Sequence, residues 1–399
     1  MTSDAGQIWW TEIANPGRFI EDVQTALVDG RSVLLQIGLA FPYRWTFRDE
    51  ISHWMDQSNI TTEQIDCETD YTGDDIGAFL VNRLAPQFLP EYLRHRTPQL
   101  LRDNKIFSNR LIWVKGIPKE AVLKWTEFVS EFRSKSTESG VFLLEVKEME
   151  KKKSFSHSIT GLQYASYITD DDLRLYISIL SENCSMQPSL KQYAVNLITA
   201  LCNKDSETAG KMLEELDLER DDPTETLRTV LGTNFLDSPQ INCKGHPFAL
   251  LYEEAYDQLD KRIWIAQVQT VYPMIEMERL TYINRWYSEI LESLKTPFRR
   301  EGDNSPHYLM DIEGNQITDP YEIEIGQLSL LITVRNYDDA TQYQLYIPDE
   351  SLRNRIRFLR TCRNQLAHLK KCETAECYQM LTGSFLRTTK SLWCKKYRA

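Results

Sequence analysis

The segment RNQLAH, from Arg363 to His368, places a guanidinium and an imidazole a few residues apart. An imidazole titrates near neutral pH, so it can remove a proton from a hydroxyl group or donate one to a departing oxygen. A guanidinium keeps its charge and presents a planar fork of N–H donors that fits phosphate oxygens. These residue types are suited to cleaving a phosphodiester; the alternative is a basic surface helix with a solvated face.

The segment lies in the most basic part of an acidic chain. The 399 residues carry a formal net charge of −12, whereas residues 345–399 contain twelve Lys and Arg against four Asp and Glu. This end of the chain is therefore +8, and the remainder is −20. Such a balance excludes a protein that wraps nucleic acid with its whole surface, but it indicates a local site for a polyanion.

A helical pattern extends over residues 348–371. At about 100° per residue, one sector is apolar and packs inward, through Leu352, Ile356, Leu359 and Leu366. Another sector is polar and holds Arg353, Arg357, Arg360, Asn364, His368 and Lys371. Arg363 falls inside the apolar sector, where a guanidinium requires a partner, an interface or a break in the helix. Glu322 and Glu324 are the candidate partners.

The surrounding elements predict a bundle of four helices, over residues 277–295, 321–334, 348–371 and 373–393. A polar segment at 298–320, rich in Gly, Asp and Asn, interrupts them as an excursion. On an unbroken third helix, Arg363 and His368 point about 140° apart. Their cooperation therefore requires a distortion of the helix near Asn364 or a second chain.

The pattern Arg363-Asn364-x-x-x-His368, late in such a bundle, resembles the R-x(4–6)-H signature of HEPN domains. The resemblance covers about residues 275–399 and implies a metal-independent endoribonuclease that works as a homodimer, in anti-phage defence or a toxin–antitoxin system. It implies that His368 is the acid or base, that Arg363 clamps the phosphate and that Asn364 orients one of these groups. Flanking RNA phosphates would be held by Arg353, Arg357, Arg360 and Lys371. Other HEPN proteins lack catalysis, so the alternative is an adaptor or scaffold subunit that uses the bundle for assembly.

The first part of the chain, residues 1–160, alternates apolar runs at 32–41, 110–117 and 140–146 with helical patterns. This order predicts a parallel sheet covered by helices, and the chain as a whole is then α/β plus all-α. The pattern faintly resembles the core of an AAA- or STAND-type ATPase. However, LAFPYRWTF follows the first strand where a P-loop would be required, and no GxGxxG is present. We expect a degenerate domain without a nucleotide cofactor that docks a partner protein; an NTPase with an unusual phosphate site is the remaining alternative.

Residues 161–272 read as a helical subdomain, and the bundle domain follows at 273–399. The eight cysteines form no CxxC pair, and reduced thiols are expected in a chain without a recognisable signal peptide. Cys372 and Cys377 lie close to His368, but zinc requires four ligands and no second pair has finger-like spacing, so no metal is predicted. No apolar run is long enough for a bilayer, and we expect a cytoplasmic protein without membrane contact.

Overall fold

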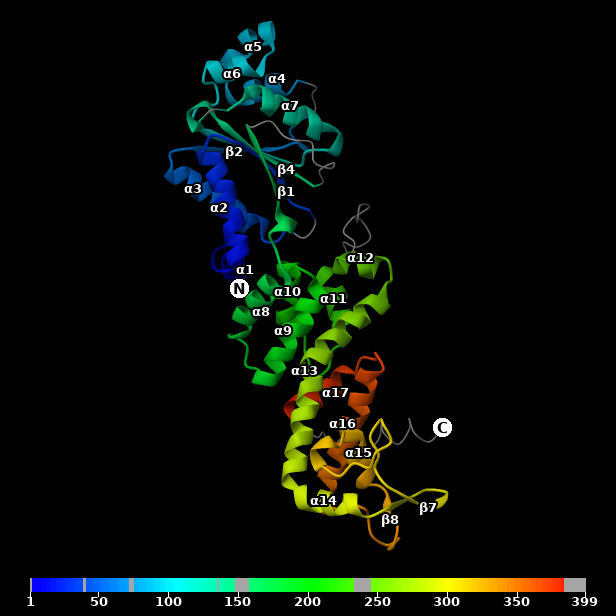
Figure 1. The fold of residues 1–399 in the computed structure, drawn as a ribbon. Coiled ribbons are helices and arrows are strands. Elements are labelled where there is room, and N and C mark those ends of the chain that lie inside the picture. Colours follow the sequence, from blue (N-terminus) through cyan, green and yellow to red (C-terminus); the bar gives the residue numbers. More distant parts are fainter. Residues whose placement is uncertain are drawn as a thin grey trace. The chain divides into compact units, whose positions relative to one another are not determined.

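The computed structural model describes residues 2–38, 41–71, 75–134, 136–147, 158–232 and 245–383. They form two compact units (Figure 1). The first unit comprises the described parts of 1–180, 202–211 and 241–246, and the second those of 181–201, 212–240 and 247–399. Among these residues, no helix combines the length and the apolar character needed to cross a bilayer.

A five-stranded sheet forms the centre of the first unit. Its strands are β1 (Ser32–Gln36), β2 (Thr61–Asp66), β3 (Arg110–Lys115), β4 (Val141–Val146) and β5 (Ile159–Gln163). Their order is β2-β3-β4-β1-β5, and every neighbouring pair is parallel. Strand β4 is buried along its whole length, as expected for a parallel strand covered on both faces. The predicted parallel α/β architecture is confirmed.

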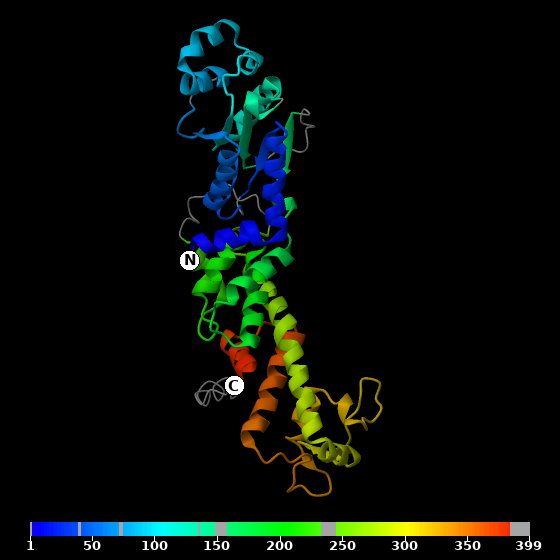
Figure 2. The same ribbon diagram turned by 90° about the vertical axis from the view of Figure 1, so that its left-hand side faces the viewer.

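Helices cover both faces of this sheet (Figure 2). Side chains alternate between the faces along each strand, and one face joins Ile112 and Phe142 to α4 (Ile76–Leu84) and α7 (Val122–Phe132) in a single apolar core. On the other face, Phe47 of α3 (Arg44–Gln57) meets the ring of Trp113. Asp75 caps α4 by accepting from the Ala78 N–H at 2.9 Å. The other α-helices of this unit are α1 (Thr2–Gln7), α2 (Ala14–Val28), α5 (Leu89–His95), α6 (Pro98–Asp103) and α8 (Asp170–Ser181), and α10 (Ser206–Glu215) begins in it and ends in the second unit.

Two strands of the sheet are absent from the sequence prediction. Strand β2, TTEQID, lies between the first two predicted strands, and β5, ITGLQ, follows the last one. Both are edge strands, so each needs only one neighbour and keeps part of its surface in solvent. Their polar or mixed composition therefore lacks the apolar run that marks β1, β3 and β4.

The second unit is built around α13 (Tyr256–Arg285), a helix of 30 residues that continues through Pro273. The boundary predicted at residue 273 thus lies inside a helix. Figure 2 shows α16 (Glu350–Ala367, orange) beside α13 (yellow-green), and α17 (Thr374–Thr382) also contacts α13. The remaining helices are α9 (Pro188–Cys202), α11 (Pro223–Leu231), α12 (Pro247–Tyr252), α14 (Tyr287–Lys295) and α15 (Ile325–Leu331).

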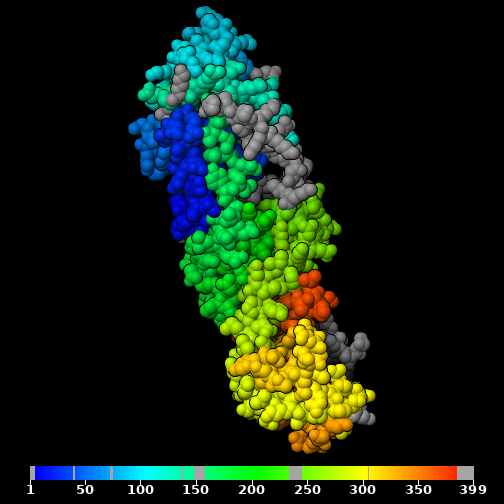
Figure 3. Space-filling view, in the orientation of Figure 1, coloured from blue at the N-terminus to red at the C-terminus, as the bar shows by residue number. Residues whose placement is uncertain are grey.

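The bundle differs in detail from its prediction. Helix α15 has 7 residues and replaces the longer helix predicted over 321–334. The 298–320 excursion contributes β6 (Phe298–Arg300) and β7 (Asp303–His307), which form a small antiparallel sheet with β8 (Arg335–Asn336). In Figure 3 this excursion (yellow) forms a continuous part of the unit's surface. The fourth helix, predicted over 373–393, corresponds to α17, which begins at Thr374 and ends at Thr382. The part of the prediction from residue 384 onward lies outside the described residues.

A buried arginine joins three helices of this unit. Arg355 of α16 is 8% exposed and forms a two-pronged ion pair with Glu278 of α13, with N···O distances of 2.9 and 2.8 Å. Its Nη atoms also donate to the Gln379 and Met380 carbonyls of α17, at 3.0 and 2.9 Å. Several guanidinium donors are thus satisfied without water, which a buried arginine requires.

We expect Glu278→Gln to lower the free energy of unfolding by about 2 kcal/mol or more, because Arg355 is left buried without its countercharge. Glu292→Gln is the matched control, since Glu292 pairs with Lys295 on the surface, with side chains 72% and 57% exposed. That change should cost less than about 1 kcal/mol. Urea denaturation of both variants makes the comparison, and equal losses would contradict the role given to Arg355.

Candidate functional site

An open pocket of about 860 Å³ lies along one face of α16 in the second unit. Helix α16 contributes Arg357, Arg360, Thr361, Asn364, Gln365 and His368 to its lining. Ser329 and Thr333 line it from α15 and the turn that follows, and Lys370 lines it from the segment after α16. The pocket therefore gathers residues from α16 and from segments on either side of it in sequence.

Helical spacing explains why these α16 residues share one face. Arg357, Arg360, Asn364 and His368 follow one another at three- or four-residue steps, which keeps them on one side of the helix. The opposite side holds Ile356, Leu359, Cys362 and Leu366, all buried. Asp349 begins the helix as its cap, accepting from the Ser351 N–H at 2.9 Å. The local sequence alone therefore fixes both faces of α16.

The pocket is positively charged. Its lining includes Arg357, Arg360 and Lys370, and none of the described residues that line it is acidic. Arg357 donates to the Asn354 Oδ1 at 3.2 Å, and none of the three cations forms an ion pair with a carboxylate of the described residues. In a chain of net charge −12 this is a local concentration of uncompensated positive charge, which attracts an anion with several charged oxygens.

Two buried polar atoms of the lining residues also lack a hydrogen-bond partner. Ser329 Oγ and Gln365 Oε1 have none among the described residues, although the Ser329 side chain is fully buried. Buried polar groups are normally paired, because leaving one unpaired costs about 1–3 kcal/mol. A ligand in this pocket is one way in which these groups acquire partners.

His368 lies at the point where α16 ends. The helix stops at Ala367, the His368 N–H donates to the Asn364 and Gln365 carbonyls at 3.1 Å, and Leu369 turns the chain away with φ 59°. His368 is exposed and lines the pocket one helical turn beyond Asn364. A substrate in the pocket would reach both groups without any displacement of the helix.

Arg363 points elsewhere. Its Nη2 donates to Glu324 Oε2 at 2.9 Å, with side chains 24% and 59% exposed, and this pairing accounts for an arginine in the apolar sector. Of the two candidate partners, Glu324 makes the contact; Glu322 is exposed on the turn Pro320–Glu322. Because α16 continues without a break past Asn364, a single chain does not bring Arg363 to His368.

Two further residues predicted to bind RNA lie outside the pocket lining. Arg353 donates to the Pro348 and Ile347 carbonyls, at 3.1 Å for Pro348, and thereby braces the start of its own helix. Lys371 pairs with Asp260 at 2.6 Å. Sequence reasoning missed Ser329, Thr333 and Lys370 as pocket residues. For the first two no sequence signal exists, because their place depends on how α15 packs against α16.

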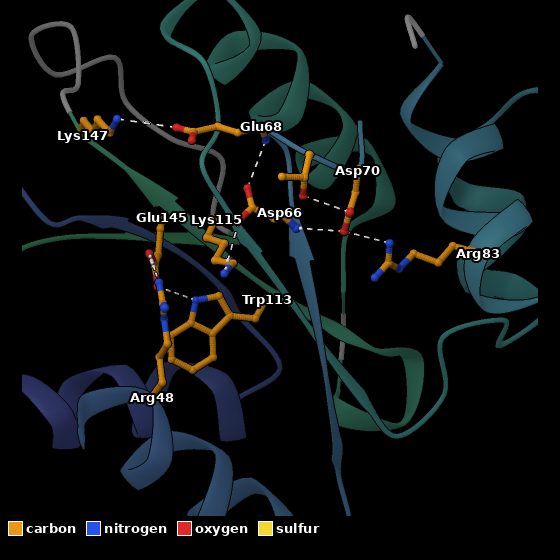
Figure 4. Close-up of polar contacts among 10 residues, drawn as sticks. Arg48, Asp66, Glu68, Asp70, Arg83, Trp113, Lys115, Glu145 and Lys147 are labelled. Carbon is orange, nitrogen blue, oxygen red and sulfur yellow. Dashed lines mark hydrogen bonds and ion pairs between the residues drawn. The ribbon is translucent and has the colours of Figure 1, made fainter. Parts of the chain in front are cut away.

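The carboxyl end of the sheet in the first unit is different. Ligands of open α/β sheets bind at this edge, and a smaller hollow of about 330 Å³ is present there. Figure 4 shows that six of its charged groups form three ion pairs: Lys115 with Asp66 at 3.3 Å, Lys147 with Glu68 at 3.6 Å, and Arg48 with Glu145 at 3.0 Å. Trp113 Nε1 also donates to Glu145 at 2.7 Å. A fourth cation, Arg44, lines the hollow and donates to the Gly38 carbonyl at 3.3 Å. An anion that bound Lys115, Lys147 or Arg48 would therefore have to displace an existing ion pair.

Comparisons of the chain with protein-family models and with curated proteins give no match. The α16 pocket is thus described by its own residues: cations without countercharges, unpaired polar atoms and an exposed imidazole.

We expect the double variant Arg357→Ala/Arg360→Ala to weaken binding of a short 2′-O-methyl RNA, which cannot be cleaved. Each cation that contacts a phosphate contributes about 0.7 to the slope of log K against log salt for a single strand. The slope should therefore fall by roughly 1.4 if both contact phosphates. Fluorescence anisotropy at several salt concentrations measures it. Arg353→Ala, on the same helix but outside the pocket, is the control, and an equal fall there would contradict the assignment.

Proposed function

We propose that the protein is a metal-independent endoribonuclease of the HEPN type, an effector that cleaves RNA in the cytoplasm. The observation that carries this proposal is the α16 pocket, where His368 stands beside Arg357, Arg360 and Asn364 and no acidic side chain is found among the described lining residues. RNA supplies the polyanion for the cations and the hydroxyl group for the imidazole. A role in anti-phage defence or in a toxin–antitoxin pair follows from the resemblance to HEPN domains.

The chemistry requires no metal. The 2′-oxygen of the ribose attacks the adjacent phosphorus while its proton leaves, and the bond from phosphorus to the 5′-oxygen breaks as that oxygen gains a proton. The products are a 2′,3′-cyclic phosphate and a 5′-hydroxyl. His368 is suited to one of the two proton transfers, and the arginines stabilise the charge that builds on the phosphorane oxygens.

A homodimer completes the proposed site. One imidazole carries one proton at a time, and Arg363 is held by Glu324 away from His368 of its own chain. A second chain docked against this unit would supply a second imidazole and bring Arg363 of one protomer to His368 of the other. This is the arrangement that the HEPN resemblance implies.

One observation favours a second function, that of a non-catalytic adaptor. The Arg363–Glu324 pair and the unbroken α16 keep the two residues of the signature apart in each chain. In that case the second unit serves for assembly. In both cases the first unit is proposed to dock a partner protein, since three of the four cations at its sheet edge, Arg48, Lys115 and Lys147, are already paired with carboxylates.

Purified protein should cleave single-stranded RNA in buffer without added metal ions and leave 2′,3′-cyclic phosphate ends, identified by mass spectrometry. His368→Ala should reduce the rate by about 100-fold or more, the usual contribution of a positioned acid or base. Arg353→Ala should retain the wild-type rate. Wild-type protein without cleavage, or His368→Ala with full cleavage, would leave the adaptor as the function.

Mixing two inactive variants tests the composite site. If Arg363 of one protomer serves His368 of the other, Arg363→Ala and His368→Ala should each be inactive alone. A mixture, after subunit exchange, should recover part of the activity, because each heterodimer contains one intact site. Mass photometry establishes that dimers have exchanged. Exchange without recovery would show that the two residues do not act together across an interface.

A further inference from the structure

Three cysteine side chains meet in the interior where α16 turns into α17. Cys362 belongs to α16, Cys372 to the connecting segment and Cys377 to α17, and they are 0%, 2% and 0% exposed. The Cys362 and Cys372 sulfur atoms lie within 4.8 Å of each other, and the Cys372 sulfur is 3.7 Å from the Cys362 carbonyl oxygen. Cys377 neighbours Cys372 but lies outside that 4.8 Å group. All three thiols are shielded from solvent.

A carboxylate joins this cluster. The ligand atoms of Cys362, Cys372 and Glu376 all lie within 4.8 Å of one another. Glu376 is half-buried in the first turn of α17, where its Oε2 accepts from the Glu373 N–H at 3.0 Å as part of a capping box. The carboxylate adds an oxygen ligand to the sulfur ligands, a combination that a zinc ion accepts.

The surrounding residues hold the cluster in place. Gln267 of α13 is 1% exposed; its Oε1 accepts from the Cys372 N–H at 2.8 Å, and its Nε2 donates to the Cys372 carbonyl at 3.0 Å. The same Nε2 donates to the Tyr193 hydroxyl at 3.3 Å. Outer residues of this kind orient the ligands of metal sites and add to metal affinity.

We propose that Cys362, Cys372, Cys377 and Glu376 bind a zinc ion that fixes the turn between α16 and α17. Thiolates select soft or borderline ions, and zinc accepts three sulfur ligands and one oxygen in a closed tetrahedral site. At zinc–ligand distances of about 2.0–2.3 Å, neighbouring ligand atoms stand roughly 3.5–3.8 Å apart. Cys362, Cys372 and Glu376 need small shifts to reach that geometry, and Cys377, which lies outside their 4.8 Å group, has to turn its side chain toward them. With four protein ligands the ion has a structural role and no open position for substrate.

Metal content and cobalt spectra test the site without any measurement of RNA cleavage. Full-length protein purified without chelator should contain about one zinc per chain by plasma mass spectrometry, the ratio of a single four-ligand site. Metal-free protein given Co²⁺ alone should develop thiolate-to-cobalt charge-transfer absorption together with the intense visible bands of tetrahedral cobalt. Wild-type protein with no zinc and no such bands, including protein whose Cys362 and Cys372 are found as a disulfide, would overturn the proposal.

Cys372→Ser should lose the charge-transfer absorption, and Glu376→Gln should keep it but bind cobalt at least about 10-fold more weakly, the scale on which changes around a metal site act. Cys67→Ser is the matched control, a buried cysteine of the first unit that should leave both unchanged. Circular dichroism reports whether each variant folds. Glu376→Gln, which keeps all three thiols, tests the site even if Cys372→Ser does not fold, and wild-type cobalt affinity in a folded Glu376→Gln would remove the carboxylate from the site.

Discussion

The buried guanidinium of Arg355 is the constraint on which the second unit depends. It lies between α13 and α17 and bonds to Glu278 on one and to two main-chain carbonyls on the other. Because these partners approach from fixed directions, α16 has one allowed rotation about its axis. A shift of one residue would move the apolar face out of the core and leave a charge buried without partners, which costs several kcal/mol.

That rotation determines two other features at once. It directs Arg357, Arg360 and Asn364 outward into the pocket, and it directs Cys362 inward toward Cys372 and Cys377. The C-terminal end of α16 likewise contributes to both the pocket and the buried thiols. The residue that closes the helix, His368, faces the open pocket, and the segment that follows returns Cys372 to the interior. The charged site and the thiol cluster therefore lie on opposite sides of one helix, and neither shares a ligand atom with the other.

How much of this the sequence predicts depends on the range of each interaction. Strands β1, β3 and β4 are continuous apolar runs, and the polar face of α16 follows from helical spacing, so both are visible locally. The edge strands β2 and β5 form by pairing with distant neighbours. The sequence does not distinguish Arg355 from the other basic residues of α16, because its partner Glu278 lies 77 positions earlier in the chain. Likewise the thiol cluster is hidden, because Cys362 is separated from Cys372 by 10 positions and spacing rules search for closer pairs.

The energetics of Arg363 decide whether its present partner prevents a role at a phosphate. Its bond to Glu324 is a pair with 24% and 59% exposed side chains, and pairs of this kind contribute about 0–1 kcal/mol. A forked contact between arginine and a phosphate is a charge-assisted hydrogen bond, worth about 1.5–3 kcal/mol. The pair with Glu324 is therefore weak enough for a phosphate within reach to compete with it. Lys371, with its side chain 29% exposed, is held by a pair of the same kind with Asp260 at 2.6 Å and lies 3.9 Å from Asp222, whereas Arg353 is bound to two carbonyls of its own segment. Neither Arg363 nor Lys371 is thus locked to its present partner.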